Sequence, residues 1–231
     1  MPAPLSIVIP TLNAADALAA ASVPLVEGVS EGLVREMVVA DGGSTDATRR
    51  VAEDLGAAWV PGPAGRGGQI ARGVAAARGD WLLILHADCH LPRGWTDSVA
   101  RHMGQSPERA GYFRLAFRAT GLPPRLVAGW ANLRAARLGL PYGDQGLLIA
   151  RDVLARAGGV PDLPLMEDVA LARALRGRLS PLDATITTSA ERYLAEGWLR
   201  RGGRNLGLLA RYLAGADSDE LARAYAPRPP R

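Results

Sequence analysis

Apolar and polar positions alternate in two distinct ways along residues 1–90. Short, mostly apolar runs, as in strands buried on both faces, predict strands at 5–9, 36–40, 57–60 and 81–86, and the last of these is the most apolar. Alanine-rich or amphipathic stretches predict helices at 14–26, 45–55 and 69–78. Pro10 is expected to stop the first strand, Pro24 to break the first helix, and Ser44 or Thr45 to cap the second. Alternating strands and helices predict an α/β fold with a parallel sheet and right-handed crossovers.

The pattern changes in the second half of the chain. Alternation at 112–117 predicts a half-exposed strand, and short strands are also expected at 146–150 and 184–188. Helices are predicted at 122–138, 151–157, 166–178 and 190–214. Gly202 and Gly203 are expected to interrupt the last of them. We therefore expect an α/β domain over residues 1–190, a helical segment over 191–226 packed on it, and a disordered tail over 227–231.

Composition narrows the class of protein. Cys89 is the only cysteine, which excludes an intrachain disulfide framework. The net charge of +4 comes from arginines dispersed among acidic residues, so no nucleic-acid partner is expected. The N-terminus lacks a basic leader, and the apolar run Trp81–Leu85 is too short to span a bilayer. We expect a cytoplasmic protein, or one peripheral to the inner membrane face.

Polar clusters follow three of the predicted strands, at 10–13, 41–44 and 86–90. In open parallel sheets, ligands bind outside the carboxyl ends of the strands, so these clusters are expected along one edge. Asp41 could accept hydrogen bonds from a nucleobase or ribose, or could only bond the backbone of its own turn. Asp88 could hold a divalent cation that bridges diphosphate oxygens, or could be a turn residue before Pro92.

A zinc site at His86, Cys89 and His90 is not expected. Adjacent residues on an extended strand point to opposite faces, and no second ligand pair with zinc spacing is present.

Two further segments carry charged residues in suggestive places. Residues 61–68 are rich in proline and glycine and predict a loop, and the overlapping stretch 65–73 fits neither a P-loop nor a dinucleotide-binding pattern. We therefore expect a flexible glycine loop that carries Arg66 just before the helix at 69–78. Its Arg66 could pair with phosphate or be a solvated surface residue. Glu167 and Asp168 begin a predicted helix, where acids are favoured on electrostatic grounds alone, but one of them could be a general base.

Together these segments resemble the family 2 glycosyltransferases, which have the GT-A fold. Ile7–Asn13 resembles that family's first strand and nucleotide loop, and Val38–Asp46 its DDGSTD segment. Ala75–Asp88 resembles the segment that ends in the metal-binding DXD motif, and Leu165–Asp168 the acceptor-side ED motif. The closest likeness is a small bacterial subgroup with HAD in place of DXD, a GR loop and a GDQ motif. Those motifs correspond here to 86–88, 65–66 and 143–145.

The resemblance implies a role for each matching residue. Nucleotide binding falls to Pro10, Thr11, Asn13, Asp41, Arg66 and Asp88, with Asp88 the ligand of Mn²⁺ or Mg²⁺. Asp168 becomes the catalytic base beside Glu167, and the acceptor side includes Gly143, Asp144 and Gln145. The implied donor is a UDP- or GDP-sugar and the acceptor an unidentified hydroxyl compound. A single carboxylate base predicts inversion at the anomeric carbon.

Three positions depart from the family pattern. Ala14 replaces an acidic residue, Ala71 an asparagine, and His86 the first acid of DXD.

Two other functions are open on the sequence alone. A nucleotidyltransferase would need a basic glycine loop after the first strand, where this chain has 10–13; a non-catalytic binding protein would not need Asp168.

The basic helix predicted near the C-terminus has two interpretations. Its arginines and its apolar residues, such as Trp198 and Leu206, would suit an interfacial helix on an anionic membrane. More commonly, such a helix covers the core of its own domain, and we favour that interpretation.

Overall fold

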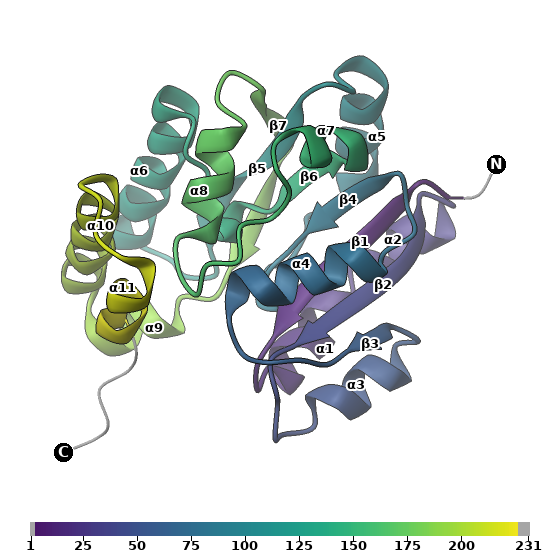
Figure 1. Cartoon of the computed structure of the whole chain (residues 1–231), viewed down its shortest axis with the longest axis horizontal. Helices are drawn as coiled ribbons and strands as arrows, with labels where there is room; N and C mark the ends of the chain where they lie inside the picture. The colour runs from purple at the N-terminus through teal and green to yellow at the C-terminus, as the bar shows by residue number, and fades with distance from the viewer. Residues whose placement is uncertain (1–2, 226–231) are drawn as a thin grey trace.

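The computed structural model describes residues 3–225. Its central feature is a seven-stranded sheet (Figure 1). The strand order is β3-β2-β1-β4-β6-β5-β7, and only β6 runs against the others. The strands are β1 (Leu5–Thr11), β2 (Val34–Asp41), β3 (Ala58–Val60), β4 (Trp81–Ile84), β5 (Ala110–Phe117), β6 (Leu147–Ala150) and β7 (Leu179–Thr188). The predicted α/β class with a mostly parallel sheet is therefore confirmed.

Helices cover both faces of this sheet. They are α1 (Ala15–Ser22), α2 (Leu25–Ser30), α3 (Thr48–Asp54), α4 (Arg66–Ala76), α5 (Trp95–Gln105), α6 (Leu122–Leu138), α7 (Arg151–Arg156), α8 (Glu167–Ala174), α9 (Glu191–Glu196), α10 (Trp198–Leu213) and α11 (Ser218–Tyr225), with the 3₁₀ turn η1 at Gly143–Gln145. In Figure 1, α4 lies in front of β1 and β2, and α2 lies behind them. The last three helices gather beside α6, at the other end of the sheet from α3.

The centre of the sheet forms the main core. Ile7 and Val8 of β1 and Leu82 and Leu83 of β4 are fully buried, because these strands have neighbours on both sides and helices on both faces. Burying such side chains is the main source of folding free energy. A four-residue run that is apolar throughout is therefore a reliable strand signal here.

Several predicted boundaries are wrong. β1 continues through Pro10 to Thr11, because its pairing with β4 ends at Val8 and an edge position tolerates the missing N–H. Helix α3 begins only at Thr48, since the Ser44 and Thr45 side chains bond the loop after β1 rather than cap a helix. The strand at β5 is mostly buried rather than half-exposed.

The C-terminal helices also differ from expectation in one respect. Gly202 and Gly203 lie inside α10, and the interruption falls at Gly197, whose φ of 88° suits glycine alone. Leu208 and Leu209 of α10 and Leu221 of α11 are buried against α8 and the segment before it, in a second core that includes Leu165, Met166 and Val169.

Within residues 3–225, no helix combines the length and apolarity needed to cross a membrane. The predicted disordered tail at 227–231 lies outside the described residues.

Candidate active site

The polar ends of β1 and β2 meet at one edge of the sheet, as predicted. Pro10 and Thr11 end β1 directly beside Ala40 and Asp41 of β2, and the Thr11 hydroxyl donates to Asp41 Oδ1 at 2.9 Å. His86 follows β4 at the same edge, where the antiparallel β6 also begins after η1. The four chain segments thus border one site.

Asp41 is committed to the turn that it begins. The residue is 2% exposed, and its carboxylate accepts hydrogen bonds from the N–H groups of Gly43 and Ser44, both at 2.7 Å, and from the Ser44 hydroxyl. Burial alone would raise the pKa of Asp41, but the bonds from Ser44, Gly43 and Thr11 outweigh it and hold the pKa below its usual value. Asp41 shapes the turn in this structure; its contact with a nucleotide stays a prediction.

The loop after β1 is tied to the loop after β2. The Asn13 N–H donates to Ser44 Oγ at 2.8 Å, and Asn13 Oδ1 accepts from the Thr45 N–H at 2.8 Å. Asn13 has a φ of 50°, a left-handed conformation that asparagine tolerates better than most residues. Three of the predicted nucleotide residues, Thr11, Asn13 and Asp41, therefore belong to one hydrogen-bonded cradle.

Two residues of α4 that the sequence did not single out support this cradle. The buried Gln69 donates from Nε2 to the carbonyls of Thr11 at 2.7 Å and Ala40 at 3.1 Å, so it joins the ends of β1 and β2 to α4. Arg72 donates to the Asp41 carbonyl at 3.2 Å. Arg72, rather than Arg66, is thus the arginine that bonds the Asp41 turn.

Arg66 is the first residue of α4, so the glycine-rich stretch is a helix start and not the flexible loop that we predicted. The Gly67 N–H donates to the Leu163 carbonyl at 3.1 Å, and a Cβ on Gly67 would collide with the Pro161 and Leu163 backbone. This close approach brings Arg66 Nε to 3.5 Å from Glu167 Oε1. Burial lowers the pKa of Arg66, but the neighbouring carboxyl groups of Glu167 and Asp168 more than reverse this effect, so the pKa is raised.

Glu167 and Asp168 begin α8 in different surroundings. Asp168 Oδ2 accepts from the Gly143 N–H at 2.8 Å. Glu167 is 2% exposed, and its oxygens have no hydrogen-bond partner within residues 3–225. Burial and the neighbouring Asp168 raise the pKa of Glu167 to about 8, although Arg66 acts in the other direction. The protonated form of Glu167 is therefore favoured at neutral pH.

Candidate metal ligands lie in the turn after β4. Ligand atoms of His86, Asp88 and Cys89 are all within 4.8 Å of one another. The argument that neighbouring residues must face apart is wrong here, because these residues form a turn and not an extended strand. His90 is not part of this group. Asp88 Oδ2 also accepts from the Thr188 hydroxyl at 3.2 Å, which fixes the carboxylate.

The donor chemistry of this turn suits a divalent cation. The buried Nε2 of His86 has no hydrogen-bond partner among the described residues. Burial and the Arg66 charge lower the pKa of His86 to about 4, so the imidazole is neutral and free to coordinate. Burial raises the pKa of the Cys89 thiol, which makes this sulfur a poor ligand. A carboxylate oxygen and one imidazole nitrogen, completed by oxygens of a bound diphosphate, fit Mn²⁺ well.

The predicted acceptor-side residues divide into two kinds. Gln145 is fully buried and bonds the Phe113 carbonyl at 3.2 Å, so it holds η1 on β5. Gly143 and Asp144 remain at the site, and Asp144 Oδ1 is buried with no hydrogen-bond partner among the described residues. Burial raises the pKa of Asp144 to about 6 against the opposing charge of Arg134.

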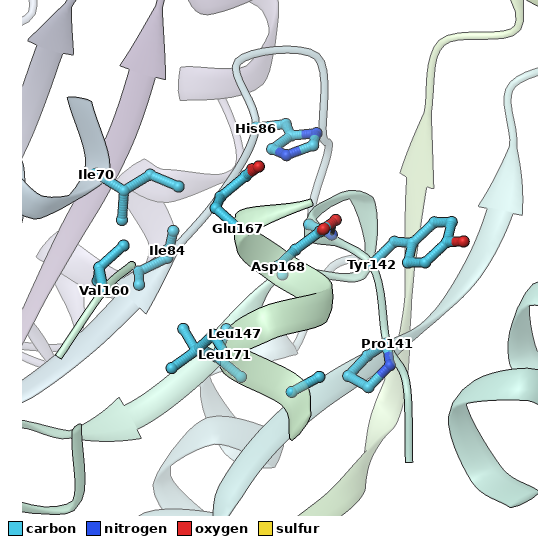
Figure 2. A pocket seen from close by; sticks show the side chains of 13 residues that line it. Ile70, Ile84, His86, Pro141, Tyr142, Leu147, Val160, Glu167, Asp168 and Leu171 are labelled. Atoms are coloured by element: carbon cyan, nitrogen blue, oxygen red, sulfur yellow. Dashed lines mark hydrogen bonds between the residues drawn. The ribbon is translucent and has the colours of Figure 1, made fainter. Parts of the chain in front are cut away.

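An apolar pocket lies under the two acids of α8. Figure 2 shows Glu167 directed toward the His86 ring, with Asp168 beside it and Tyr142 opposite. The floor of the pocket is aliphatic and includes Ile70, Ile84, Leu147, Val160 and Leu171. This floor provides the low-polarity surroundings that keep Glu167 neutral.

Comparison with known proteins identifies the family. Residues 6–126, more than half of the chain, match the family model described as glycosyl transferase family 2. The chain belongs to glycosyl transferase family 2. No curated protein sequence matches this glycosyltransferase.

Solved structures similar to the glycosyltransferase share its fold. One is glucosyl-3-phosphoglycerate synthase from Mycobacterium tuberculosis in complex with Mn²⁺, uridine diphosphate and phosphoglyceric acid, with a TM-score of 0.57, 20% identity, and coverage of 93% of this chain and 80% of that one. The same enzyme with Mn²⁺ and UDP-glucose has a TM-score of 0.55, 22% identity, and coverage of 80% and 69%. Mannosyl-3-phosphoglycerate synthase from Rubrobacter xylanophilus has a TM-score of 0.55, 18% identity, and coverage of 90% and 75%. The predicted GT-A fold is confirmed.

Proposed function

We propose that this glycosyltransferase moves a sugar from a UDP- or GDP-sugar to a hydroxyl acceptor, with Mn²⁺ or Mg²⁺, and inverts the anomeric configuration. The observation that carries the proposal is the position of Asp88, Arg66 and Asp168 around His86, where the charges of all three act on the imidazole, at the sheet edge that also carries Thr11 and Asn13. Similar folds solved with Mn²⁺ and uridine nucleotides support the donor class.

The leaving group sets the requirements of the reaction. The bond between the anomeric carbon and the diphosphate oxygen breaks, and the diphosphate leaves with concentrated negative charge. Arg66, one-third exposed at the start of α4, can pair with phosphate oxygens. Asp88 and His86 would hold the cation, which when bound supplies further positive charge to the diphosphate.

The acceptor proton needs a carboxylate. In our proposal Asp168 takes this proton while the acceptor oxygen bonds the anomeric carbon. Its bond from the Gly143 N–H orients Oδ2 without neutralising it. Glu167 is a poor candidate for the base, because its raised pKa favours a form that already holds a proton. With one base and no separate nucleophilic carboxylate in the proposal, a single displacement inverts the centre.

Binding of UDP and GDP, with and without Mn²⁺, tests the donor half of the proposal. Calorimetry should detect binding that needs the cation and that weakens at least about tenfold in Asp88→Ala, the loss typical for a metal-site change. Asp80→Ala is the matched control, because Asp80 is exposed just before the amino end of β4. This variant should bind the nucleotide and the cation as the wild type does. Equal metal-dependent binding by Asp88→Ala would remove Asp88 from the role.

A further inference from the structure

A second cavity, here called the α6–α10 groove, opens between these two helices. Its lining comes from β5, η1, α6, α9 and α10, and Tyr142 lines both this groove and the pocket under Glu167. Leu115, Phe117, Val127, Trp130, Ala131 and Leu206 form an apolar and aromatic wall, and the polar side chains of Arg134, Asp144, Tyr193 and Asn205 also line the groove.

The η1 side of the groove carries an unpartnered carboxylate oxygen. Asp144 lines the groove, and its buried Oδ1 has no hydrogen-bond partner within residues 3–225. A buried polar atom of this kind costs free energy unless a bound molecule supplies the missing hydrogen bond. Asp144 directly follows Gly143, whose N–H holds Asp168. The groove therefore reaches the residue next to the support of the proposed base.

The other side of the groove continues into exposed apolar surface. Trp130 and Leu206 line the groove and are also about half exposed, at 47% and 48%. Further exposed apolar residues on the same two helices are Leu122, Leu126, Leu133, Leu199 and Leu213. A molecule with an apolar body could thus lie along α6 and α10 while its polar end reaches Asp144.

We infer that the α6–α10 groove binds the apolar part of the acceptor, which is a neutral hydroxyl compound with an alkyl or aromatic body. This inference rests on the proposed function, because it names the class of acceptor. A second hydroxyl of the acceptor, beside the one that faces Asp168, donates a hydrogen bond to Asp144 Oδ1, and the apolar body covers the aromatic wall. A small polar acceptor would leave that wall exposed to water. An anionic end would face the carboxylate of Asp144, whereas the Arg134 guanidinium in the lining already bonds the Leu140 carbonyl and stacks on the Tyr142 ring.

Two adjacent glycines of α10 provide a matched pair of variants. Gly202 lines the groove and Gly203 is exposed, yet a Cβ at either position would meet no heavy atom within 4 Å. Both positions are inside a helix, where replacing glycine favours helix formation. Gly202→Phe should fill the groove, whereas Gly203→Phe should place the same ring in solvent.

Binding of octyl β-glucoside and methyl β-glucoside, which differ only in the apolar chain, tests the inference. Below the concentration at which micelles form, saturation-transfer NMR should give at least roughly tenfold tighter binding for the octyl compound, since several methylene groups leave water. Gly202→Phe should remove this preference, and Gly203→Phe should keep it. Equal binding of the two glucosides, or a preference unchanged in Gly202→Phe, overturns the inference.

Two added measurements separate this inference from other possibilities. Binding of UDP with Mn²⁺ should be the same in both variants; if wild type fails to bind it but keeps the octyl preference, the proposed donor function is wrong and the groove assignment stands. If there is no octyl preference but anionic vesicles bind wild type and Gly202→Phe equally, the exposed faces of α6 and α10 contact a lipid surface instead, and the inference fails.

Discussion

Replacement of Glu167 by glutamine tests the protonation of this buried acid. The side chain is 2% exposed, its oxygens lack hydrogen-bond partners within the described chain, and Arg66 Nε lies 3.5 Å away. Burial and Asp168 raise the pKa of Glu167 from 4.5 to about 8 in the folded protein. Glutamine has nearly the same shape as the protonated acid and stays neutral at every pH. The variant therefore keeps the favoured form and removes the ionisable one.

The pKa difference sets the sign and size of the effect on stability. Between pH 4.5 and about 8, folded Glu167 holds a proton that the unfolded chain has lost. The free energy of unfolding of the wild type therefore falls as pH rises, by at most about 1.4 kcal/mol per pH unit through this group. From pH 5 to pH 7 the loss is up to about 3 kcal/mol. Glu167→Gln should not show this loss of stability, because it lacks the ionisable group.

Urea unfolding at pH 5, 6 and 7 measures this difference. The stability of Glu167→Gln relative to the wild type should increase steadily over this range, by up to about 3 kcal/mol. Glu53→Gln, which removes an exposed glutamate of α3 paired with Arg49, controls for the general effect of losing a carboxylate. A relative stability of Glu167→Gln that does not change with pH would refute the reasoning. Glu167 would then be ionised and could itself serve as the base.

Three further predictions concern the site and its supports. Asp168→Asn should lower turnover by at least about 100-fold while UDP binding stays normal, because the amide cannot accept the acceptor proton; a larger loss in Glu167→Gln would reverse the assignment. Gly143→Ala places a methyl group against His86 Nε2 and should weaken Mn²⁺ binding roughly tenfold in a titration followed by electron paramagnetic resonance; unchanged affinity would remove His86 from the ligands. Gly67→Ala should destabilise the protein by about 1–3 kcal/mol in denaturant melts, and more than Gly68→Ala, whose new methyl would meet side-chain atoms of Asp162 and Arg72 and not the backbone; equal effects would contradict the close backbone approach.

The sequence was most informative about strands buried on both faces. Leu82 and Leu83 are fully buried in a run with no polar residue, and such a run has few alternatives to a central strand. The first half of β7 was missed, because it contains Pro181 and Asp183. These residues are tolerated since β7 lies at the end of the strand order. The reversed direction of β6 also gives no signal in its four apolar residues.

The site was predictable where chain topology alone brings residues together. Thr11 and Asp41 end two parallel strands and Asp88 comes after a third, and such strands end at the same edge. The support from α4 was not predictable, because Gly67 meets the backbone at Leu163 only after the sheet and the second half of the chain have packed. The paired buried bonds of Gln69 likewise depend on two strand ends that lie far from it in the sequence.

The start of α8 joins the two halves of the proposed site. Arg66 reaches Glu167 from the first half of the chain, and the Gly143 N–H reaches Asp168 from the second. Behind these acids, Leu208 and Leu209 of α10 pack into the core that contains Met166, the residue before them. The position of the proposed base relative to the donor cradle thus depends on packing from both halves and from the C-terminal helices. Changes in α10 that leave the groove open but loosen this core should therefore lower turnover before they lower donor binding, since the cradle of β1 and β2 does not rest on α10.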